Sequence, residues 1–188
     1  MTPPILLSAD VIDQRIRELG TELSRDYADV PQLHFICVLK GAFVFLADLV
    51  RAVDKPTTID FLAVSSYAKG TTSTGEVRLL KDLDAALNGR DVLIVEDIVD
   101  TGLTLQYLQE ILRARGPRTL RTVCLLSKPS RRKVDVPVDY IGFTIEDRFV
   151  VGYGLDFEGR YRGLPYIGVL DDEAGKPGAV GKSTAPAR

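Results

Sequence analysis

The side chains best suited to chemistry in this 188-residue chain follow an apolar run at residues 92–95. That run ends in three carboxylates, Glu96, Asp97 and Asp100, and its β-branched residues predict a strand buried on both faces. Ionised carboxylates at the end of a buried strand need water, a metal ion or hydrogen-bond donors. Because ligands of open α/β sheets bind at the carboxyl ends of the strands, the three acids predict a ligand site there.

A short turn of small and hydroxyl-bearing residues comes next. It contains Thr101, Gly102 and Thr104 and leads into apolar residues at helical spacing, so it predicts the start of a helix. Backbone N–H groups at a helix start, together with threonine hydroxyls and a glycine that lets the backbone approach closely, can cradle a phosphate. The turn lacks the spacing and the lysine of a Walker A loop. An ordinary buried strand followed by an acidic, solvated helix cap is the alternative that these residues alone leave open.

The elements that must position these residues alternate between strands and helices. Strands are predicted at residues 33–39, 57–66, 77–80, 91–95, 119–126, 138–145 and 165–170, and helices at 8–26, 42–53 and 105–115. Such an alternation predicts an α/β fold, in which a mostly parallel, twisted sheet carries helices on both faces. The strands at 77–80 and 91–95 are expected to be neighbours, joined by a turn at Asn88 and Gly89.

Length and composition are those of one globular domain. With 45% hydrophobic and 27% charged residues, the chain can bury a sizeable core, and we expect residues 1–170 to form a single domain, followed by a disordered tail at 171–188. A net charge of −2 gives no general attraction to nucleic acid or to an anionic membrane. The sequence shows no signal peptide and no segment apolar and long enough to span a bilayer, which predicts a cytoplasmic protein.

Histidine and cysteine chemistry is not expected. The chain has one histidine, His34, at the start of a predicted strand, which excludes histidine-rich metal sites and predicts a structural role. Cys37 and Cys124 each lie inside an apolar run and form neither a CxxC pair nor a zinc-binding set. Both cysteines are therefore predicted to be buried free thiols.

Five segments in a fixed order carry a family resemblance. They are Leu39-Lys40-Gly41, Ser66-Tyr67 and residues 92–104, 125–128 and 149–156. In this order they resemble the type I phosphoribosyltransferases, and among them the hypoxanthine (6-oxopurine) phosphoribosyltransferases, over nearly the whole length except the tail. The resemblance implies purine salvage, in which Mg²⁺-dependent transfer moves the 5-phosphoribosyl group of phosphoribosyl diphosphate (PRPP) to N9 of hypoxanthine or guanine. The products would be IMP or GMP and diphosphate.

The resemblance also assigns roles around PRPP. Asp100 would accept the proton of the purine N7 as N9 attacks. The ribose and its 5′-phosphate would be bound by Glu96, Asp97, Thr101, Gly102, Leu103 and Thr104, the diphosphate by Lys40, Gly41 and Arg162, and magnesium by Glu96, Asp97 and Asp156. Some relatives carry lysine where this chain has Leu103, so phosphate binding here must depend more on the backbone and on hydroxyls. A cis peptide bond between Leu39 and Lys40 is implied as well.

For the base, the resemblance points to Lys128, Phe149 and Val150. An ammonium group only donates hydrogen bonds, so Lys128 at the purine 6-position suits a carbonyl and opposes the amino group of adenine. Phe149 would stack on the base while the main chain at Val150 reads its edge. Ser66 and Tyr67 would belong to a lid that excludes water. The resemblance further implies a small hood subdomain, built from the N-terminal segment and residues 140–170, and a homodimer or homotetramer.

Ordinary alternatives stand beside these roles. Lys40 could simply extend to water, and residues 68–75 could be an exposed hairpin connection. The basic cluster at 131–133 is interpreted as a solvated turn. Phe149 could be a core residue, and Arg162 could belong to a surface ion pair.

Two other functions compete with the transferase. One is a PRPP-sensing regulator that binds RNA or DNA, which would need a basic face or an added DNA-binding domain. The other is a phosphoribosyltransferase for a different base, such as a pyrimidine, for which Lys128 and Phe149 would lose their assigned roles.

Overall fold

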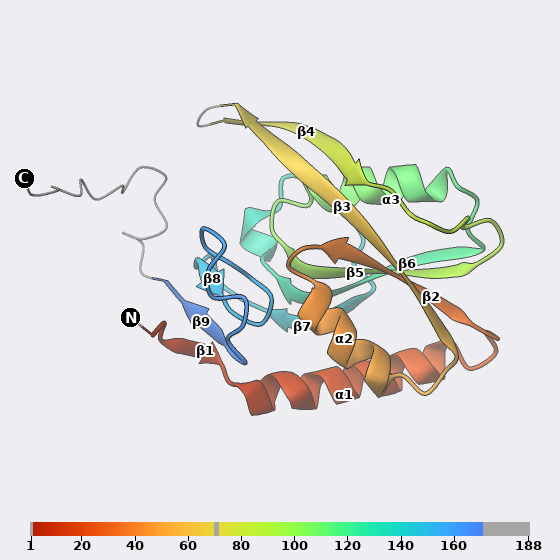
Figure 1. The fold of residues 1–188 in the computed structure, drawn as a ribbon, viewed down its shortest axis with the longest axis horizontal. Coiled ribbons are helices and arrows are strands. Elements are labelled where there is room, and N and C mark those ends of the chain that lie inside the picture. The colour runs from red at the N-terminus through yellow and green to blue at the C-terminus, as the bar shows by residue number, and fades with distance from the viewer. Residues whose placement is uncertain (1, 70–71, 171–188) are drawn as a thin grey trace, which may run out of the picture.

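A six-stranded sheet with the order β4-β3-β2-β5-β6-β7 forms the centre of the molecule (Figure 1). The computed structural model describes residues 2–69 and 72–170, with only the backbone for 66–69 and 72–76, so the predicted tail at 171–188 lies outside the described residues. The elements are β1 (Ile5–Leu7), α1 (Ala9–Asp26), β2 (Leu33–Leu39), α2 (Phe43–Ala52), β3 (Thr57–Lys69), β4 (Thr72–Lys81), β5 (Asp91–Val99), α3 (Leu103–Arg113), β6 (Thr119–Ser127), the 3₁₀ turn η1 (Pro129–Arg131), β7 (Tyr140–Thr144), β8 (Val150–Val151) and β9 (Ile167–Val169).

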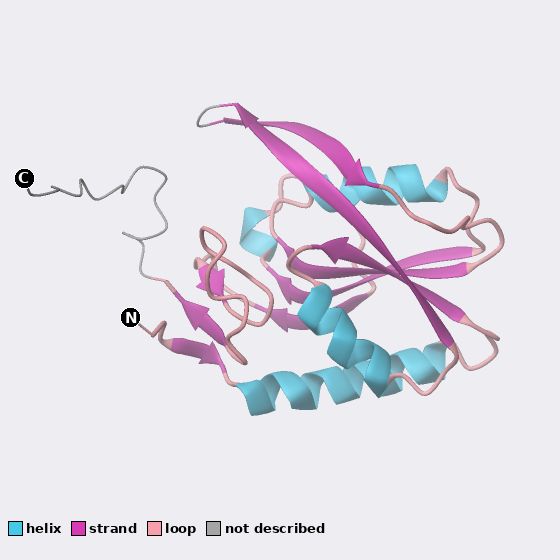
Figure 2. Ribbon diagram, in the orientation of Figure 1, coloured by secondary structure: helices cyan, strands magenta, loops and turns pink. Residues whose placement is uncertain are grey.

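Five of the six central strands run parallel, and β4 pairs antiparallel with β3 at one edge. Helices α1 and α2 cover one face of the sheet and α3 covers the other (Figure 2). The predicted α/β fold, a mostly parallel sheet with helices on both faces, is confirmed.

The pattern of apolar residues in each strand and helix reflects which of its faces are buried. In β2, Phe35 and Cys37 pack with α1 and α2, while Ile36 and Val38 pack on the α3 side. Both faces are covered, so the strand is apolar at every position instead of alternating. On α1, by contrast, apolar residues recur at helical spacing, and they include Ile12 and Leu19, which are at most 1% exposed.

One predicted strand pairing is wrong. The segments at 77–80 and 91–95 are not neighbours, because β4 lies at the edge beside β3, whereas β5 lies between β2 and β6. Gly89 does adopt a positive φ of 73°, but its N–H bonds to the carbonyl of Gly116 in the loop before β6. An Asn-Gly pair predicts a local turn and does not identify the strands that pair across it.

A second, three-stranded sheet has the order β1-β9-β8. We call this sheet and the loop at 152–166 the hood. The strand β1 was not among the predicted elements, because three residues give too little pattern, and its antiparallel pairing with β9 brings the two ends of the described chain together (Figure 1). Within the described part of the chain, we find no helix with both the length and the apolar character needed to cross a membrane.

Candidate active site

The predicted site residues meet at the carboxyl edge of the central sheet. From β2 the chain continues to β3 on one side, while β5 pairs on the other side, so β2 and β5 flank the topological switch point. Ligands of open α/β sheets bind at such a point. A cavity of about 350 Å³ lies there. Ten predicted residues line it, namely Lys40, Gly41, Glu96, Asp97, Asp100, Thr101, Gly102, Thr104, Asp156 and Arg162.

Four other predicted residues, Leu103, Lys128, Phe149 and Val150, lie outside the lining of this cavity. Leu103 is the first residue of α3 and is partly buried. Lys128 directly follows β6, Phe149 directly precedes β8, and Val150 is the first residue of β8, in the hood. The side chains of Ser66 and Tyr67 lie outside the described residues, so the lid stays a prediction.

Gly41 fits against Asp97 with no room for a side chain. A Cβ atom at Gly41 would lie 1.3 Å from Asp97 Oδ2 and 2.5 Å from Asp97 Cγ. The turn after β2 therefore packs directly against Asp97, an acid near the carboxyl end of β5. The Leu39–Lys40 peptide bond in this turn is cis, which confirms that prediction.

Glu96 and Asp97 are acids in an environment that opposes their ionisation. Glu96 is 6% exposed, and burial and the neighbouring Asp97 raise its pKa well above the ordinary value. Burial also raises the pKa of Asp97 to about 6, although hydrogen bonds from its own N–H and that of Ile98 act in the opposite direction. Carboxylates with raised pKa values in a cleft are typical of functional sites, because a cation there can restore their charge.

The turn before α3 depends on a glycine with a positive φ. Gly102 has a φ of 86°, and a Cβ atom there would lie 2.9 Å from Val136 Cγ1, so this position requires glycine. Thr101 Oγ1 accepts a long hydrogen bond of 3.5 Å from the N–H of Leu103. The first turn of this 11-residue helix, whose N–H groups lack acceptors within the helix, therefore contributes Thr104 and Leu105 to the lining of the cavity.

Asp156 and Arg162 close the cavity from the hood side. Arg162 forms a 2.5 Å salt bridge with Asp156, and it also donates a 2.6 Å hydrogen bond to the carbonyl oxygen of Gly154. Arg162 lowers the pKa of Asp97 while Asp156 raises it, so both residues act electrostatically on the acids of β5. Within the described residues, no three side chains of the His, Cys, Asp and Glu types converge as a complete metal site.

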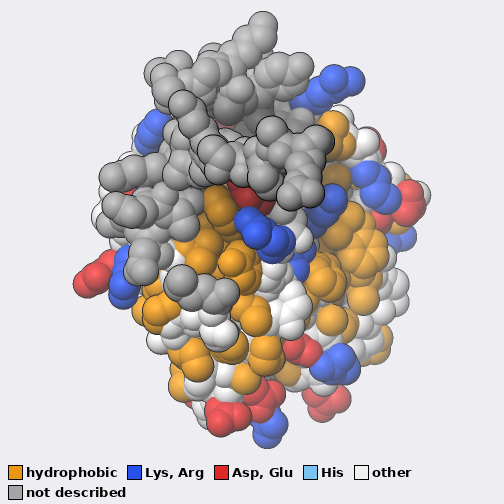
Figure 3. Space-filling model, turned by 60° about the vertical axis from the view of Figure 1, so that its left-hand side comes forward, with side chains coloured by type: hydrophobic (Ala, Val, Ile, Leu, Met, Phe, Trp, Pro, Cys, Tyr) orange, Lys and Arg blue, Asp and Glu red, His pale blue; other side chains and the backbone are white. Residues whose placement is uncertain are grey.

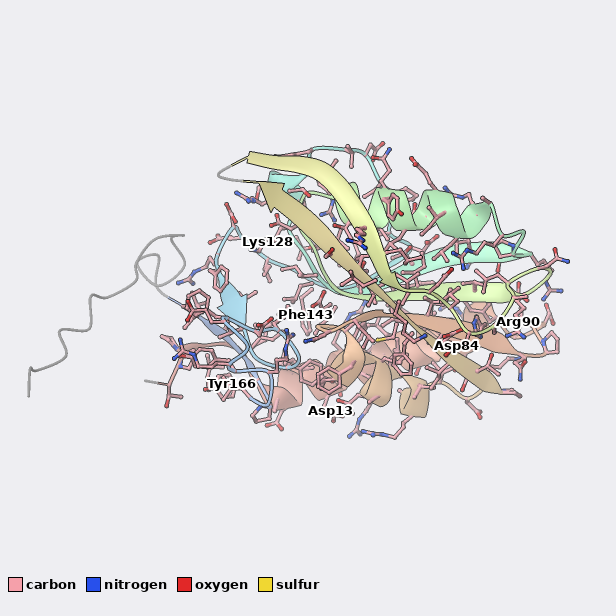
Figure 4. The ribbon with its side chains drawn as sticks, turned by 45° about the horizontal axis from the view of Figure 1, so that its top comes forward. Asp13, Asp84, Arg90, Lys128, Phe143 and Tyr166 are labelled. Carbon is pink, nitrogen blue, oxygen red and sulfur yellow. The ribbon has the colours of Figure 1, made fainter. Side chains whose placement is uncertain are left out.

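Lys128 is buried at the end of β6, where its side chain is directed to the loop before β8. It is labelled in Figure 4 at the hood end of the sheet, opposite Arg90. Its Nζ donates a 2.6 Å hydrogen bond to the carbonyl oxygen of Arg148 and lies 3.7 Å from Asp147 Oδ1.

Phe149 is 38% exposed and packs edge-on against Phe157, with ring centroids 5.6 Å apart. It is therefore not the core residue of the alternative interpretation.

Sequence reasoning missed two arginines. Arg132 donates to the carbonyl oxygens of Val99 and Asp100, the second at 2.5 Å, and Arg131 Nε donates to Asp100 Oδ1 at 3.1 Å. Arg131 and Lys133 are exposed, as the predicted solvated turn requires, whereas Arg132 is partly buried. The available signal was their position directly after Lys128, since residues that follow parallel strands meet at one edge.

Comparison with known proteins gives one consistent family. The phosphoribosyl transferase domain family matches residues 6–158. The hypoxanthine-guanine phosphoribosyltransferase of Bacillus subtilis (strain 168) is 52% identical over 166 residues, covering 88% of this chain and 92% of that protein. The protein of the same name from Mycobacterium bovis is 52% identical over 172 residues, covering 89% and 85%.

A solved structure agrees with the sequence relatives. The crystal structure of a hypoxanthine phosphoribosyltransferase from Staphylococcus aureus superposes with a TM-score of 0.87 at 46% sequence identity. The superposition covers 92% of this chain and 94% of that one.

Proposed function

This chain belongs to the phosphoribosyl transferase domain family, and from that premise we propose that it transfers the 5-phosphoribosyl group of PRPP to N9 of hypoxanthine or guanine. The products are IMP or GMP and diphosphate, so the reaction salvages free purines. The observation that carries the proposal is the meeting of Glu96, Asp97 and Asp100 with a helix start in one cavity at the switch point of the sheet.

The acids of β5 suit a reaction in which the sugar becomes positively charged. As the bond from C1 of the ribose to the diphosphate breaks, positive charge spreads over the ribose ring. In the free protein, the surroundings of Glu96 and Asp97 disfavour the ionised forms of these two carboxylates. A positive charge that develops beside them therefore stabilises the ionised forms. Their interaction with the substrate is therefore stronger in the transition state than in the ground state, which is what accelerates a reaction.

Asp100 serves as the proton acceptor. It lies at the loop after β5 and lines the cavity next to the phosphate turn. When N9 of the purine forms its bond to C1, the ring loses the proton on N7, and the carboxylate of Asp100 takes that proton. The proton then leaves with solvent after product release.

We propose that Mg²⁺ is the metal of the reaction and that Glu96, Asp97 and Asp156 are its candidate ligands, with substrate oxygens supplying the rest, because these carboxylates do not converge as one complete site. Magnesium is commonly bound by one or two carboxylates plus phosphate oxygens, which fits an incomplete set of protein ligands. The raised pKa values of Glu96 and Asp97 fit the same ion, because a divalent cation favours their charged forms. When bound, the ion neutralises charge on the diphosphate as it leaves.

Lys128 selects the base. Its buried ammonium group bonds a main-chain oxygen in the free protein, and a 6-oxo group offers an equivalent acceptor. The amino group of adenine would face the ammonium with another donor, which leaves both unpaired. Phe149, on the adjoining loop, supplies an accessible ring for stacking.

The β3–β4 hairpin is the proposed lid. Strand β3 is paired with β2 as far as Ala63 and then continues to Lys69, so it projects about 20 Å beyond the sheet edge at which the cavity lies. The projecting backbone contains Ser66 and Tyr67. Closure of this hairpin would keep water away from the cationic sugar.

We also propose that the chain forms a homodimer or homotetramer in which the α2 face of the sheet is an interface. Ile59 and Phe61 pair in register with Phe35 and Cys37 and therefore point to that face, yet they are 44% and 37% exposed. Phe43, at the start of α2, is 43% exposed. Exposed aromatic and aliphatic residues on one face are typical of an interface. Substitution of Phe61 by Glu should shift the molecular mass measured by light scattering toward the monomer.

A cytoplasmic location stays a prediction from the sequence.

A base panel tests the function directly. The protein is incubated with PRPP and Mg²⁺ and with hypoxanthine, guanine, xanthine, adenine or uracil in turn, and nucleotide formation is followed by chromatography. Turnover of hypoxanthine or guanine, with none of adenine, is expected. Turnover of uracil alone would identify a phosphoribosyltransferase for another base, and absence of turnover would favour the PRPP-sensing regulator. On the face seen in Figure 3, Lys and Arg are scattered among hydrophobic and acidic side chains, which gives the regulator no support there.

A further inference from the structure

A row of four charged side chains connects the proton acceptor to the base-selecting lysine. We propose that Arg131, in this row, is a positioning residue that holds the carboxylate of Asp100 in the orientation needed to receive the N7 proton. The proposal rests on the proposed function, since it concerns a step of that reaction. Arg131 does not line the cavity that is proposed to hold the sugar and the diphosphate, so the role proposed for it is not direct contact with them.

The contacts alternate in charge. Arg131 Nε donates to Asp100 Oδ1 at 3.1 Å, and Arg131 Nη1 lies 3.4 Å from Asp147 Oδ2. The other oxygen of Asp147 lies 3.7 Å from Lys128 Nζ. One guanidinium group thus joins the loop after β5 to the loop that precedes β8, on which Phe149 is located.

The backbone brings Arg131 and Asp100 together before any substrate is present. The N–H of Lys128 bonds the carbonyl oxygen of Val99 at 3.0 Å, and the N–H of Arg131 bonds that of Lys128 at 3.1 Å. Pro129, at the start of η1, restricts the turn further. Because these bonds fix both main chains, Arg131 can restrain the side chain of Asp100 without closing a flexible loop.

The contact occupies one oxygen of the carboxylate and leaves the other available. Asp100 Oδ2 has no hydrogen-bond partner among the described residues, so it is the atom free to meet the N7 proton. A proton acceptor must lie within hydrogen-bond reach of its proton, and a carboxylate that rotates freely spends less time there.

A purely structural role explains this contact poorly. The side chains of Arg131 and Asp100 are 48% and 39% exposed, and ion pairs at such exposure contribute little to folding stability. The contact therefore has its value in orientation.

The test compares Arg131→Gln, Arg131→Lys and Asp147→Asn with Lys133→Gln, an exposed cation two residues further on the same loop. We expect Arg131→Gln to lower kcat for IMP formation about tenfold while KM for PRPP and Tm stay unchanged. Arg131→Lys should recover part of that loss, because it restores a donor and a charge. Asp147→Asn should lower kcat less and raise KM for hypoxanthine, and Lys133→Gln should match the wild type.

Three outcomes would overturn the inference. A wild-type kcat in Arg131→Gln would show that Asp100 needs no such restraint, and an equal loss in Lys133→Gln would show that only the charge of the loop matters. A fall in kcat accompanied by a lower Tm, with no recovery in Arg131→Lys, would assign Arg131 to folding. If the wild type turns over no base, the proposed function fails and this inference fails with it, which distinguishes that result from the other three.

Discussion

Acids with little exposure lie near both ends of β5, at the amino edge and at the carboxyl edge of the parallel strands. Of these acids, only the one at the amino edge forms a salt bridge with a basic side chain within the described residues. At the amino edge, Asp91 begins β5 and is 3% exposed. Thr119 Oγ1 donates to it at 2.8 Å and Arg118 Nε at 3.1 Å. Burial acts to raise the pKa of Asp91, but the bonds from Arg118 and Thr119 outweigh it, so the pKa lies below its ordinary value.

At the carboxyl edge of the same strand, Glu96 and Asp97 are arranged in the opposite way. They lie side by side, no salt bridge reaches either of them within the described residues, and their pKa values are raised. One strand thus begins with an acid held in a salt bridge and carries, near its other end, two acids that have no salt bridge within the described residues. An acid in a salt bridge can stabilise a fold, whereas acids in a cavity without a basic partner are available to a cationic ligand or transition state.

The largest effect should come from Asp100→Asn, which removes the proton acceptor at the carboxyl edge. Asparagine keeps the size of the side chain but cannot take a proton at neutral pH, so kcat for IMP formation should fall about 10²- to 10⁴-fold. The circular dichroism spectrum and Tm should stay those of the wild type, because Asp100 is 39% exposed. An undiminished rate would show that the acids at the carboxyl edge have no greater role in catalysis than the acid at the amino edge.

Substitution of the lysine at this edge should have a smaller effect. Lys128→Gln replaces a group that only donates by an amide that can donate or accept. The kcat/KM for hypoxanthine should fall about 10- to 100-fold, and its ratio to that for adenine should narrow. Steady-state rates with both bases measure this. An unchanged ratio would mean that Lys128 serves the fold, as Arg118 does at the amino edge.

The pH dependence of the activity should show that Asp97, at the carboxyl edge, takes part in ligand binding. Asp97 has a raised pKa of about 6, so below that pH it is protonated in the folded protein and must lose a proton to bind a cation. The kcat/KM for PRPP with Mg²⁺ should therefore fall toward tenfold per pH unit below about 6. A rate that stays flat down to pH 5 would contradict the assignment of Asp97 to the ligand.

Much of this arrangement could be predicted from local sequence. The buried strand before Glu96 and the glycine-containing turn after Asp100 gave the edge of the sheet and the start of α3, because both signals lie within a few residues. The order of motifs along the chain placed Lys40 and Arg162 in the same cavity.

The remaining features depend on contacts distant in sequence. The pairing of β4 with β3, in place of β5, follows from the sheet as a whole, and local turn signals say nothing of it. The contact of Arg131 with Asp100 joins residues 31 apart, and the exposure of Arg131 makes it look like any solvated basic residue in sequence. The partners of Asp91 were missed for the same reason, since Arg118 is 27 residues away.

The most direct test of the contrast between the edges measures activity and stability in Asp97→Asn and Asp91→Asn, at pH 7.5 and near pH 4. Ionised Asp97 is disfavoured in the folded state above pH 6 and this penalty disappears below pH 4, so Asp97→Asn should be more stable than the wild type by about 1–2 kcal/mol at pH 7.5 only. The same variant should lose at least about tenfold in kcat/KM. Asp91→Asn should lose about 1–3 kcal/mol of stability at pH 7.5 and keep its activity. The account is contradicted if Asp97→Asn remains fully active without gaining stability, or if Asp91→Asn loses activity at an unchanged Tm.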